Sequence, residues 1–232
     1  MNSRTRALLT LMLATIIIAA LALSGCGGGQ TEPVEQPQGE TTEQAPPETT
    51  EEAGLYTPEY KPNGEETAVF KTSKGDITVK LYGTDAPIHV GNFVELVRKG
   101  FYDKTKFHRY IDSFVVQGGD PETKEADAEF VAAEGAKPDG QGSFGTGGPG
   151  YFIKGEFDPA TNPNKHVEGA LGMARAQSPD SAGSQFYFTL AATPNLDGGY
   201  TVFGQVTDGL DVMKQLRAGD VIEKIELSGT TE

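Results

Sequence analysis

The feature that most constrains the fold of this chain is a series of short apolar segments that follow one another closely between residues 67 and 228. In the first of them, residues 67–82, apolar and polar residues alternate on both sides of a turn at Lys74-Gly75, which predicts a hairpin of half-buried strands. Parallel strands need crossovers of about a dozen or more residues, so the close spacing favours antiparallel pairing. Further strands are predicted at 107–110, 114–117, 170–175, 184–190, 201–206 and 221–227.

Two segments have the periodicity of an amphipathic helix. In residues 86–99 the apolar side chains recur at i, i+3, i+4 and i+7, which places them on one face of a helix. A second, shorter helix is predicted at 210–216, and residues 121–150 are loop-like with at most a helical turn at 126–133. Short antiparallel strands with two helices favour a mainly β fold, a closed barrel capped at its ends.

The first 26 residues have the pattern of a secretory signal. Arg4 and Arg6 precede an apolar run over residues 7–23 and small residues after it. The ending Leu-Ser-Gly-Cys resembles the lipobox of bacterial lipoproteins, which implies removal of residues 1–25 and lipidation of Cys26. Two or more acyl chains hold a protein stably at a membrane, so we expect an extracytoplasmic protein anchored to the bacterial cell membrane through Cys26. Cys26 is the only cysteine, so core packing must stabilise the fold without a disulfide.

The next segment, residues 26–66, predicts a disordered tether after the lipidated cysteine. Residues 27–66 hold ten acidic residues and one basic residue, with many Pro, Thr and Gln and few aliphatic residues. Such a composition buries too little apolar surface to offset its ordering entropy. The folded domain is therefore expected at 67–232. That domain is mildly acidic and has no basic stripe, so we expect no nucleic-acid partner.

Several chemistries find little support in the sequence. The three histidines have no metal-ligand spacing, and no second cysteine is present. No Gly-x-Ser-x-Gly elbow of a serine hydrolase occurs. The glycine-rich run 145–150 lacks the Lys-Ser/Thr pair of a phosphate-binding loop, so it is interpreted as a plain loop. His166 is interpreted as a structural, hydrogen-bonded histidine. We expect neither a metal nor a cofactor.

A hairpin at residues 107–117 carries the most informative side chains. Arg109, Phe114, Val115 and Gln117 can line a small pocket that is apolar on one side and cationic on the other. Such a pocket suits a neutral amide held against an apolar ring and contains no nucleophile. An ordinary hairpin with a solvated arginine is the alternative interpretation of these residues.

Six separated segments, rich in glycine and aromatic residues, extend this pattern along the chain: 107–109, 117–120, 145–148, 172–175, 183–186 and 202–204. Together and in this order they resemble the cyclophilin family of peptidyl-prolyl cis/trans isomerases, over about residues 67–228. The resemblance implies an eight-stranded antiparallel β-barrel with a helix capping each end. It also implies isomerase activity on proline-containing peptide segments, without a cofactor.

The resemblance implies functional roles for ten residues. Arg109 matches the catalytic arginine of the family, and Gln117 matches its substrate-orienting glutamine. The others are implied to bind substrate: Phe114, Val115, Tyr187 and Leu196 around the proline, Ala174, Arg175 and Gln185 along the peptide backbone, and Tyr200 at the rim. Val115 stands where a methionine is common, and Tyr187 where phenylalanine is usual, so its hydroxyl needs a partner or exposure.

The resulting hypothesis is a monomeric isomerase that assists the folding of exported proteins at the outer face of the cell membrane. The first alternative is a catalytically weak cyclophilin-like module that binds or chaperones its clients. A lipoprotein that binds a small molecule and a structural envelope lipoprotein are the others. Residues 122–142 look longer than the usual link in this family and are interpreted as a surface insertion or as an acidic flap that selects basic substrates.

Overall fold

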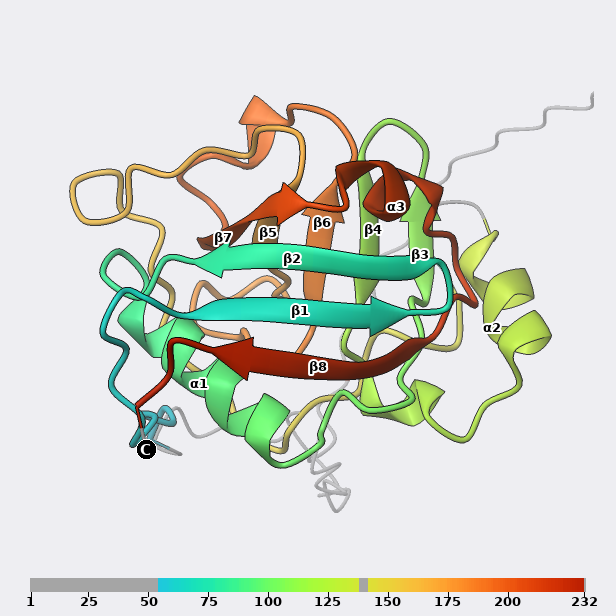
Figure 1. Ribbon diagram of the computed structural model, residues 1–232, viewed down its shortest axis with the longest axis horizontal. Coiled ribbons are helices and arrows are strands. Elements are labelled where there is room, and N and C mark those ends of the chain that lie inside the picture. Colours follow the sequence, from blue (N-terminus) through green and yellow to red (C-terminus); the bar gives the residue numbers. More distant parts are fainter. Residues whose placement is uncertain (1–53, 138–141, 232) are drawn as a thin grey trace, which may run out of the picture. The chain divides into compact units, whose positions relative to one another are not determined.

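Eight antiparallel strands form one curled sheet that makes up most of the domain (Figure 1). The computed structural model describes residues 54–137 and 142–231. The strands are ordered β3-β4-β6-β5-β7-β2-β1-β8 across the sheet. This arrangement confirms the predicted mainly β, antiparallel, eight-stranded architecture. The bounds are β1 Thr67–Thr72, β2 Gly75–Leu81, β3 Arg109–Ile111, β4 Val115–Gly118, β5 Ala170–Met173, β6 Phe186–Thr189, β7 Val202–Asp208 and β8 Ile222–Ser228.

The sheet is open, so the prediction of a closed barrel is wrong. Among the described residues, its two edge strands, β3 and β8, do not pair with each other. They approach each other through what we call the seam, residues 104–107 and 219–222, which holds one isolated bridge between Lys106 and Val221. Hydrogen bonds from Phe107 N to Asp220 O (2.9 Å) and from Ile222 N to Thr105 O (2.8 Å) support it. The reason is the position of the contact along the chain. The start of β8 meets residues 104–107, which come before β3, and β3 itself pairs only with β4.

Three α-helices accompany the sheet in the described part of the chain. Two match the predicted helices: α1, Pro87–Arg98, lies along β8, and α3, Leu210–Gln215, contacts β2. The third, α2 (Ala128–Gly135), is longer than the helical turn allowed at 126–133 in a loop-like region, so the expectation of only two helices is wrong. Its first turn is capped by Asp127, whose side chain accepts from Glu129 N at 2.8 Å and from Phe130 N at 3.1 Å.

Helix α2 is packed against the domain rather than carried on a loose insertion. Val131 is fully buried, and Gly135 lies so close to the backbone of His108 that a Cβ there would be 2.5 Å from the His108 carbonyl oxygen. The middle of the 122–142 segment therefore supports the start of β3. Residues 138–141 lie outside the described part of the chain.

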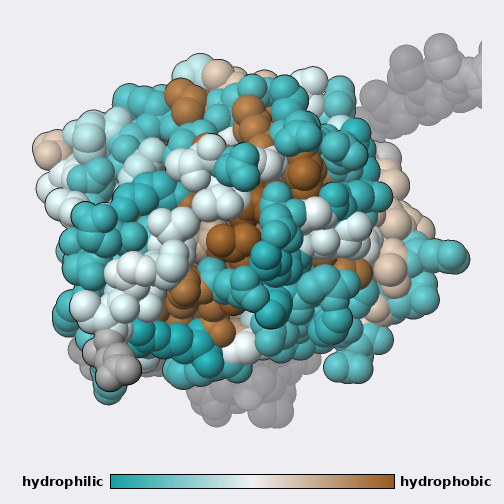
Figure 2. Space-filling model, in the orientation of Figure 1, coloured by the Kyte–Doolittle hydropathy of each residue, from teal (hydrophilic) through white to brown (hydrophobic). Residues whose placement is uncertain are grey.

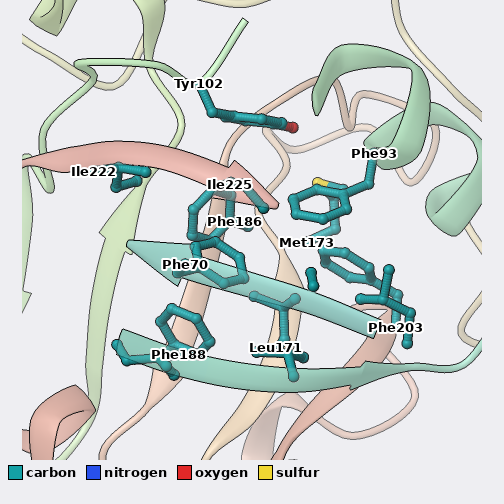
Figure 3. Close-up of a cluster of buried hydrophobic side chains, with 14 of the residues drawn as sticks. Phe70, Phe93, Tyr102, Leu171, Met173, Phe186, Phe188, Phe203, Ile222 and Ile225 are labelled. Atoms are coloured by element: carbon teal, nitrogen blue, oxygen red, sulfur yellow. The ribbon is translucent and has the colours of Figure 1, made fainter. Parts of the chain in front are cut away.

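The core between the sheet and α1 is built around aromatic rings (Figure 3). Phe186 on β6 lies at its centre, with its ring centroid 5.4 Å from that of Phe70 and 5.6 Å from that of Tyr102. The alternating residues of the predicted hairpin face this core, as expected: Ala68, Phe70, Ile77, Val79 and Leu81 are at most 1 % exposed. On the outer face formed by β1, β2 and β8, hydrophilic residues surround separated apolar ones (Figure 2).

An extended segment at residues 55–66, which we call the N-terminal segment, precedes β1 and packs on α1. The Tyr56 ring packs against that of Tyr151 at a tilt, with centroids 4.1 Å apart, and its hydroxyl donates to Glu95 Oε2 at 2.5 Å. Tyr60 is buried and its backbone N–H donates to Glu95 Oε1 at 2.9 Å. Residues 55–66, which the sequence assigned to the disordered tether, therefore pack on the folded domain, because Tyr56 and Tyr60 have partners far along the chain.

The predicted signal peptide 1–25, Cys26 and the rest of the predicted tether up to residue 53 lie outside the described residues. Within the described ranges no helix has the length and apolar character needed to cross a membrane.

Glu66, at the end of the N-terminal segment, is a buried carboxylate held by three donors. Its Oε1 accepts from the Tyr60 hydroxyl at 2.8 Å and from Asn63 N at 2.6 Å, and its Oε2 accepts from Gly64 N at 2.9 Å. Burial raises the pKa of this carboxyl, but the donors outweigh burial and hold the pKa below its usual 4.5. The charged form therefore stabilises the docked segment.

Replacing Glu66 with glutamine is expected to lower the free energy of unfolding at pH 7 by about 1.5–3 kcal/mol, because hydrogen bonds to a charged acceptor are lost. A carboxylate whose pKa is depressed on folding stabilises the fold above its unfolded pKa and ceases to do so as the pH falls through its folded pKa. The difference between wild type and Glu66→Gln should therefore shrink below about pH 4.5. Urea unfolding at several pH values measures it. The exposed neighbour serves as the control, and an equal loss in Glu65→Gln would contradict the assignment.

Candidate active site

Four neighbouring strands place Arg109, Gln117, Tyr187 and Gly172 in one row. Arg109 on β3 is directly opposite Gln117 on β4, which is opposite Tyr187 on β6, which is opposite Gly172 on β5. Directly opposed residues of antiparallel strands project from the same face of a sheet. The sequence alone predicted roles for the first three, and the sheet register brings them together.

Side-chain hydrogen bonds extend from this row toward the loop 145–152. Arg109 Nη1 lies 3.4 Å from Gln117 Oε1, and Gln117 Nε2 donates to Gln185 Oε1 at 3.0 Å. Gln185 Nε2 in turn donates to the carbonyl oxygen of Gly147 at 2.8 Å. Arg109, Gln117 and Gln185 thus form one hydrogen-bonded group with the loop 145–152. The sequence analysis had interpreted the glycine-rich part of this loop as a plain loop.

The Arg109 guanidinium is half-buried and available to a ligand. Burial lowers its pKa while the Tyr200 side chain raises it, and a guanidinium stays charged at any ordinary pH. Within the described ranges, none of the ion pairs involves Arg109. A charged group that is partly dehydrated and unpaired interacts strongly with a polar ligand that reaches it.

His108, next to Arg109, is buried and neutral. Burial lowers the pKa of its ring to about 4; Asp120 raises this pKa and Arg109 lowers it. Neither ring nitrogen has a hydrogen-bond partner among the described residues. The neighbour of Arg109 therefore adds no second positive charge at neutral pH.

The predicted apolar wall is only partly assembled by the contacts that the structure shows. Val115 and Tyr187 are 2 % and 4 % exposed, and both belong to the strands of the row. The ring of Tyr187 meets that of Tyr200 edge-on, with centroids 6.3 Å apart. Phe114 lies at the β3–β4 turn, where its carbonyl accepts from Leu190 N at 2.8 Å. Its contact with the Tyr187–Tyr200 pair, and its place in a proline pocket, stay predictions.

The predicted backbone-binding residues lie on the other side of the row. Ala174 N donates to Gln185 O at 2.9 Å, which joins these two segments. The Arg175 side chain reaches across to the 196–200 turn, with Nε donating to Gly199 O at 2.9 Å and its guanidinium 4.5 Å from the Tyr200 ring centroid. Its side chain therefore stabilises the 196–200 turn, which leaves its main chain for a ligand. Leu196, in the short 3-10 turn Pro194–Leu196, is half-buried in that turn.

A cavity of about 980 Å³ opens beside these residues. Gln117, Ala174, Arg175 and Gln185 line it, together with the loop 145–152 and Leu55 of the N-terminal segment. The sequence pattern had not marked Leu55, and no local signal in its neighbourhood reveals it.

Asp120 fixes the glycine-rich side of this cavity. Its buried carboxylate accepts from Gly145 N at 2.6 Å and from Gly147 N at 3.3 Å. A Cβ on Gly147 would lie 2.2 Å from Asp120 Oδ1, and Gly145 has a φ of +109°, so both positions require glycine. The run 145–150, interpreted from its residues as a plain loop, therefore belongs to the wall of the candidate site.

Several known proteins are similar to this chain in sequence and in fold. The family model described as cyclophilin type peptidyl-prolyl cis-trans isomerase/CLD matches residues 67–230. A peptidyl-prolyl cis-trans isomerase of Helicobacter pylori is 42% identical over 165 residues, covering 70% of this chain and 87% of the relative. Peptidyl-prolyl cis-trans isomerase B of Bacillus subtilis is 40% identical over 165 residues, covering 71% and 99%. The crystal structure of a cyclophilin type isomerase from Cryptosporidium parvum has a TM-score of 0.57 and 26% identity, covering 72% of this chain and 99% of that one.

Proposed function

This chain belongs to the cyclophilin family of peptidyl-prolyl cis-trans isomerases and is an enzyme of that class, and we propose that it acts through Arg109 and Gln117 on X–Pro bonds held against Val115 and Tyr187. The observation that carries the proposal is the row of Arg109, Gln117 and Tyr187 across three strands. It places the half-buried guanidinium, which forms no ion pair with the described residues, on the same face of the sheet as the buried Tyr187.

The reaction needs charge and shape but no nucleophile. Amide resonance opposes rotation with a barrier of about 20 kcal/mol, and uncatalysed X–Pro isomerisation takes roughly tens to hundreds of seconds. When the amide twists, resonance is lost and the proline nitrogen gains a lone pair. The Arg109 guanidinium can donate to that nitrogen while the Gln117 amide orients the carbonyl of the preceding residue.

The magnitudes are compatible with this division of roles. An acceleration of about 10⁴-fold requires about 5.4 kcal/mol of transition-state stabilisation. One well-placed charged or polar donor in a water-excluded site contributes about 2.7–4 kcal/mol. The remainder can come from the apolar wall, which holds the proline ring and excludes water from the guanidinium.

Exchange NMR spectroscopy on an Ala-Pro peptide tests the proposal directly. Catalytic amounts of the wild-type chain should produce exchange cross-peaks between the cis and trans resonances of the peptide. Peptide shifts that change on binding without exchange would instead support the catalytically weak binding or chaperone module. Titration of Val115 and Tyr187 resonances by the same peptide locates the proline.

We further propose that the enzyme is anchored by lipid on Cys26 and assists exported proteins outside the cytoplasm. The support is the sequence of residues 1–26, with its basic start, apolar run and Leu-Ser-Gly-Cys ending. Newly exported chains wait for slow prolyl isomerisation, about 10–100 s at 25 °C, so an isomerase held at the membrane surface meets its substrates as they emerge.

Replacing Cys26 with serine is expected to abolish lipid attachment and to leave residues 1–25 uncleaved. The reason is that a serine hydroxyl does not take the thioether-linked lipid and no longer matches the Leu-Ser-Gly-Cys ending. Incorporation of a palmitate analogue and the mobility of the chain on a denaturing gel measure the two changes. Thr31→Ala, in the same N-terminal region, is the control. Unchanged lipid incorporation in Cys26→Ser would exclude the anchor.

A further inference from the structure

The Tyr187 hydroxyl, which the sequence left without a partner, ends a chain of three side chains. It lies 2.9 Å from His166 Nε2, and His166 Nδ1 lies 2.8 Å from Asp197 Oδ1. The same Asp197 oxygen also accepts from the His166 backbone N–H at 2.9 Å. Asp197 directly follows Leu196, so the chain connects β6 with the turn that carries another predicted pocket residue.

The direction of these hydrogen bonds follows from the chemistry of the partners. A carboxylate only accepts, so His166 Nδ1 must carry the proton that faces Asp197. Burial lowers the pKa of His166, although Asp197 opposes this, and the neutral ring leaves Nε2 as an acceptor. The Tyr187 hydroxyl therefore donates to Nε2, and the ring of Tyr187 is held at both its ends, by the backbone of β6 and by His166.

Gly172 makes room for this arrangement. It is opposite Tyr187 on β5, and a Cβ at this position would lie 2.4 Å from Tyr187 Cζ and 2.6 Å from its hydroxyl oxygen. The tyrosine ring thus lies across the glycine on its way to His166. Tyr187 thus needs the free space at Gly172 for its ring and His166 Nε2 as the acceptor for its hydroxyl.

We propose that His166 is a positioning residue for the isomerisation, which holds the Tyr187 ring as a fixed wall of the proline pocket and, through Asp197, ties that wall to the turn of Leu196. The inference rests on the proposed function of the Arg109 row. In a purely structural role, the hydrogen bond between Tyr187 and His166 would affect only the stability of the fold. In the proposed role it also determines how tightly the substrate binds.

Steady-state kinetics of Tyr187→Phe tests the inference. The variant keeps the ring and removes only the hydrogen bond, so KM should rise about 2- to 10-fold, the range that one neutral hydrogen bond contributes. The value of kcat should stay nearly constant, because the wall contacts ground and transition states alike. His166→Gln should raise KM similarly, and the double variant should show no further rise, because both changes break the same link.

A matched control separates positioning from stability. Tyr60→Phe also removes a buried tyrosine hydroxyl from its hydrogen bond, here with Glu66 far along the chain from the row. It should lower the denaturation midpoint and leave KM and kcat unchanged. The ¹⁵N resonances of the His166 ring provide a direct signature: Nε2 should be unprotonated in the wild type and shift in Tyr187→Phe.

Gly172→Ala supplies a second, independent variant. In the wild-type background the new methyl group competes with a ring that is tied in place, so KM should rise. In the Tyr187→Phe background the ring is free to move, so adding Gly172→Ala should raise KM by less than about twofold.

The outcomes are distinguishable from a failure of the proposed function, because Arg109→Ala is assayed in parallel. If Arg109→Ala retains full activity, the site is elsewhere and the inference falls with it. If Arg109→Ala is inactive while Tyr187→Phe has the wild-type KM, only the positioning role is overturned. Additive KM effects of Tyr187→Phe and His166→Gln would likewise overturn it.

Discussion

Replacing Arg109 with alanine is expected to lower kcat/KM for an X–Pro peptide by about 100- to 1,000-fold, the cost of removing one donor that stabilises a transition state in a water-excluded site. The loss should appear mainly in kcat, because the proline nitrogen becomes an acceptor only when the amide twists. The fold should persist, since Arg109 is half-buried on a three-residue strand at the edge of the sheet. A protease-free isomerase assay and far-UV circular dichroism measure the two quantities.

Two further arginine variants make this result specific. Arg109→Lys keeps the charge but lacks the planar fork of donors, so it should restore only a small part of the activity. Arg217→Ala removes another guanidinium close to β3, which lies 4.3 Å from the Tyr110 ring centroid, and should leave kcat/KM unchanged. Wild-type turnover in a folded Arg109→Ala chain would refute the catalytic role.

Replacing Phe186 with alanine is expected to destabilise the domain by about 3–5 kcal/mol, the usual cost of deleting a buried phenylalanine ring. Its ring contacts those of Phe70, Phe93, Tyr102, Phe107 and Phe188, with centroids between 5.4 and 6.3 Å apart (Figure 3). Deleting it leaves a cavity where the sheet, α1 and the start of β3 meet. Since domains of this size are stable by only about 5–15 kcal/mol, the loss is a large share of the total.

Urea unfolding followed by circular dichroism measures this effect as a lower midpoint with an unchanged slope. Phe152→Ala is the control, because that side chain is 58 % exposed and its removal should change stability by no more than about 0.5 kcal/mol. Equal midpoints for Phe186→Ala and Phe152→Ala would show that the aromatic cluster does not stabilise the fold as described.

The local periodicity of the sequence predicted those strands and helices in which the spacing of the apolar residues alone indicates the buried face. The alternation in residues 67–82 placed Phe70 and Ile77 in the core, and the i, i+3, i+4 spacing placed Val90, Phe93 and Val94 there. These signals are strong because burial on one face of a strand or helix repeats within a few residues. Helix α2 was expected to be at most a helical turn because its eight residues include only two large apolar side chains, the neighbours Phe130 and Val131, and so show little apolar periodicity.

The parts that could not be predicted depend on partners that lie far apart along the chain. The N-terminal segment looks like a tether until Tyr56 meets Glu95, 39 residues away. The link between Tyr187 and His166 spans 21 residues and depends on the absence of a side chain at Gly172. A single sequence gives the identity of such residues but does not show which of them are in contact. The resemblance to a family supplied the row of Arg109 and Gln117, and the strand register supplied its geometry.

The seam ties the edge strand that carries Arg109 to the rest of the domain. Besides the bonds of Phe107 N and Ile222 N, Lys104 N donates to Ile222 O and Gly219 N donates to Phe107 O, both at 2.8 Å. Residues 104–107 lead directly into His108 and Arg109, and the Phe107 ring packs on that of Phe186, so an opening of the seam displaces the guanidinium and disturbs the aromatic core together. Amide hydrogens in such a stretch exchange only when the core opens. Heat or denaturant should therefore inactivate and unfold this enzyme in one step, and amide exchange at Phe107 should be as slow as in β6.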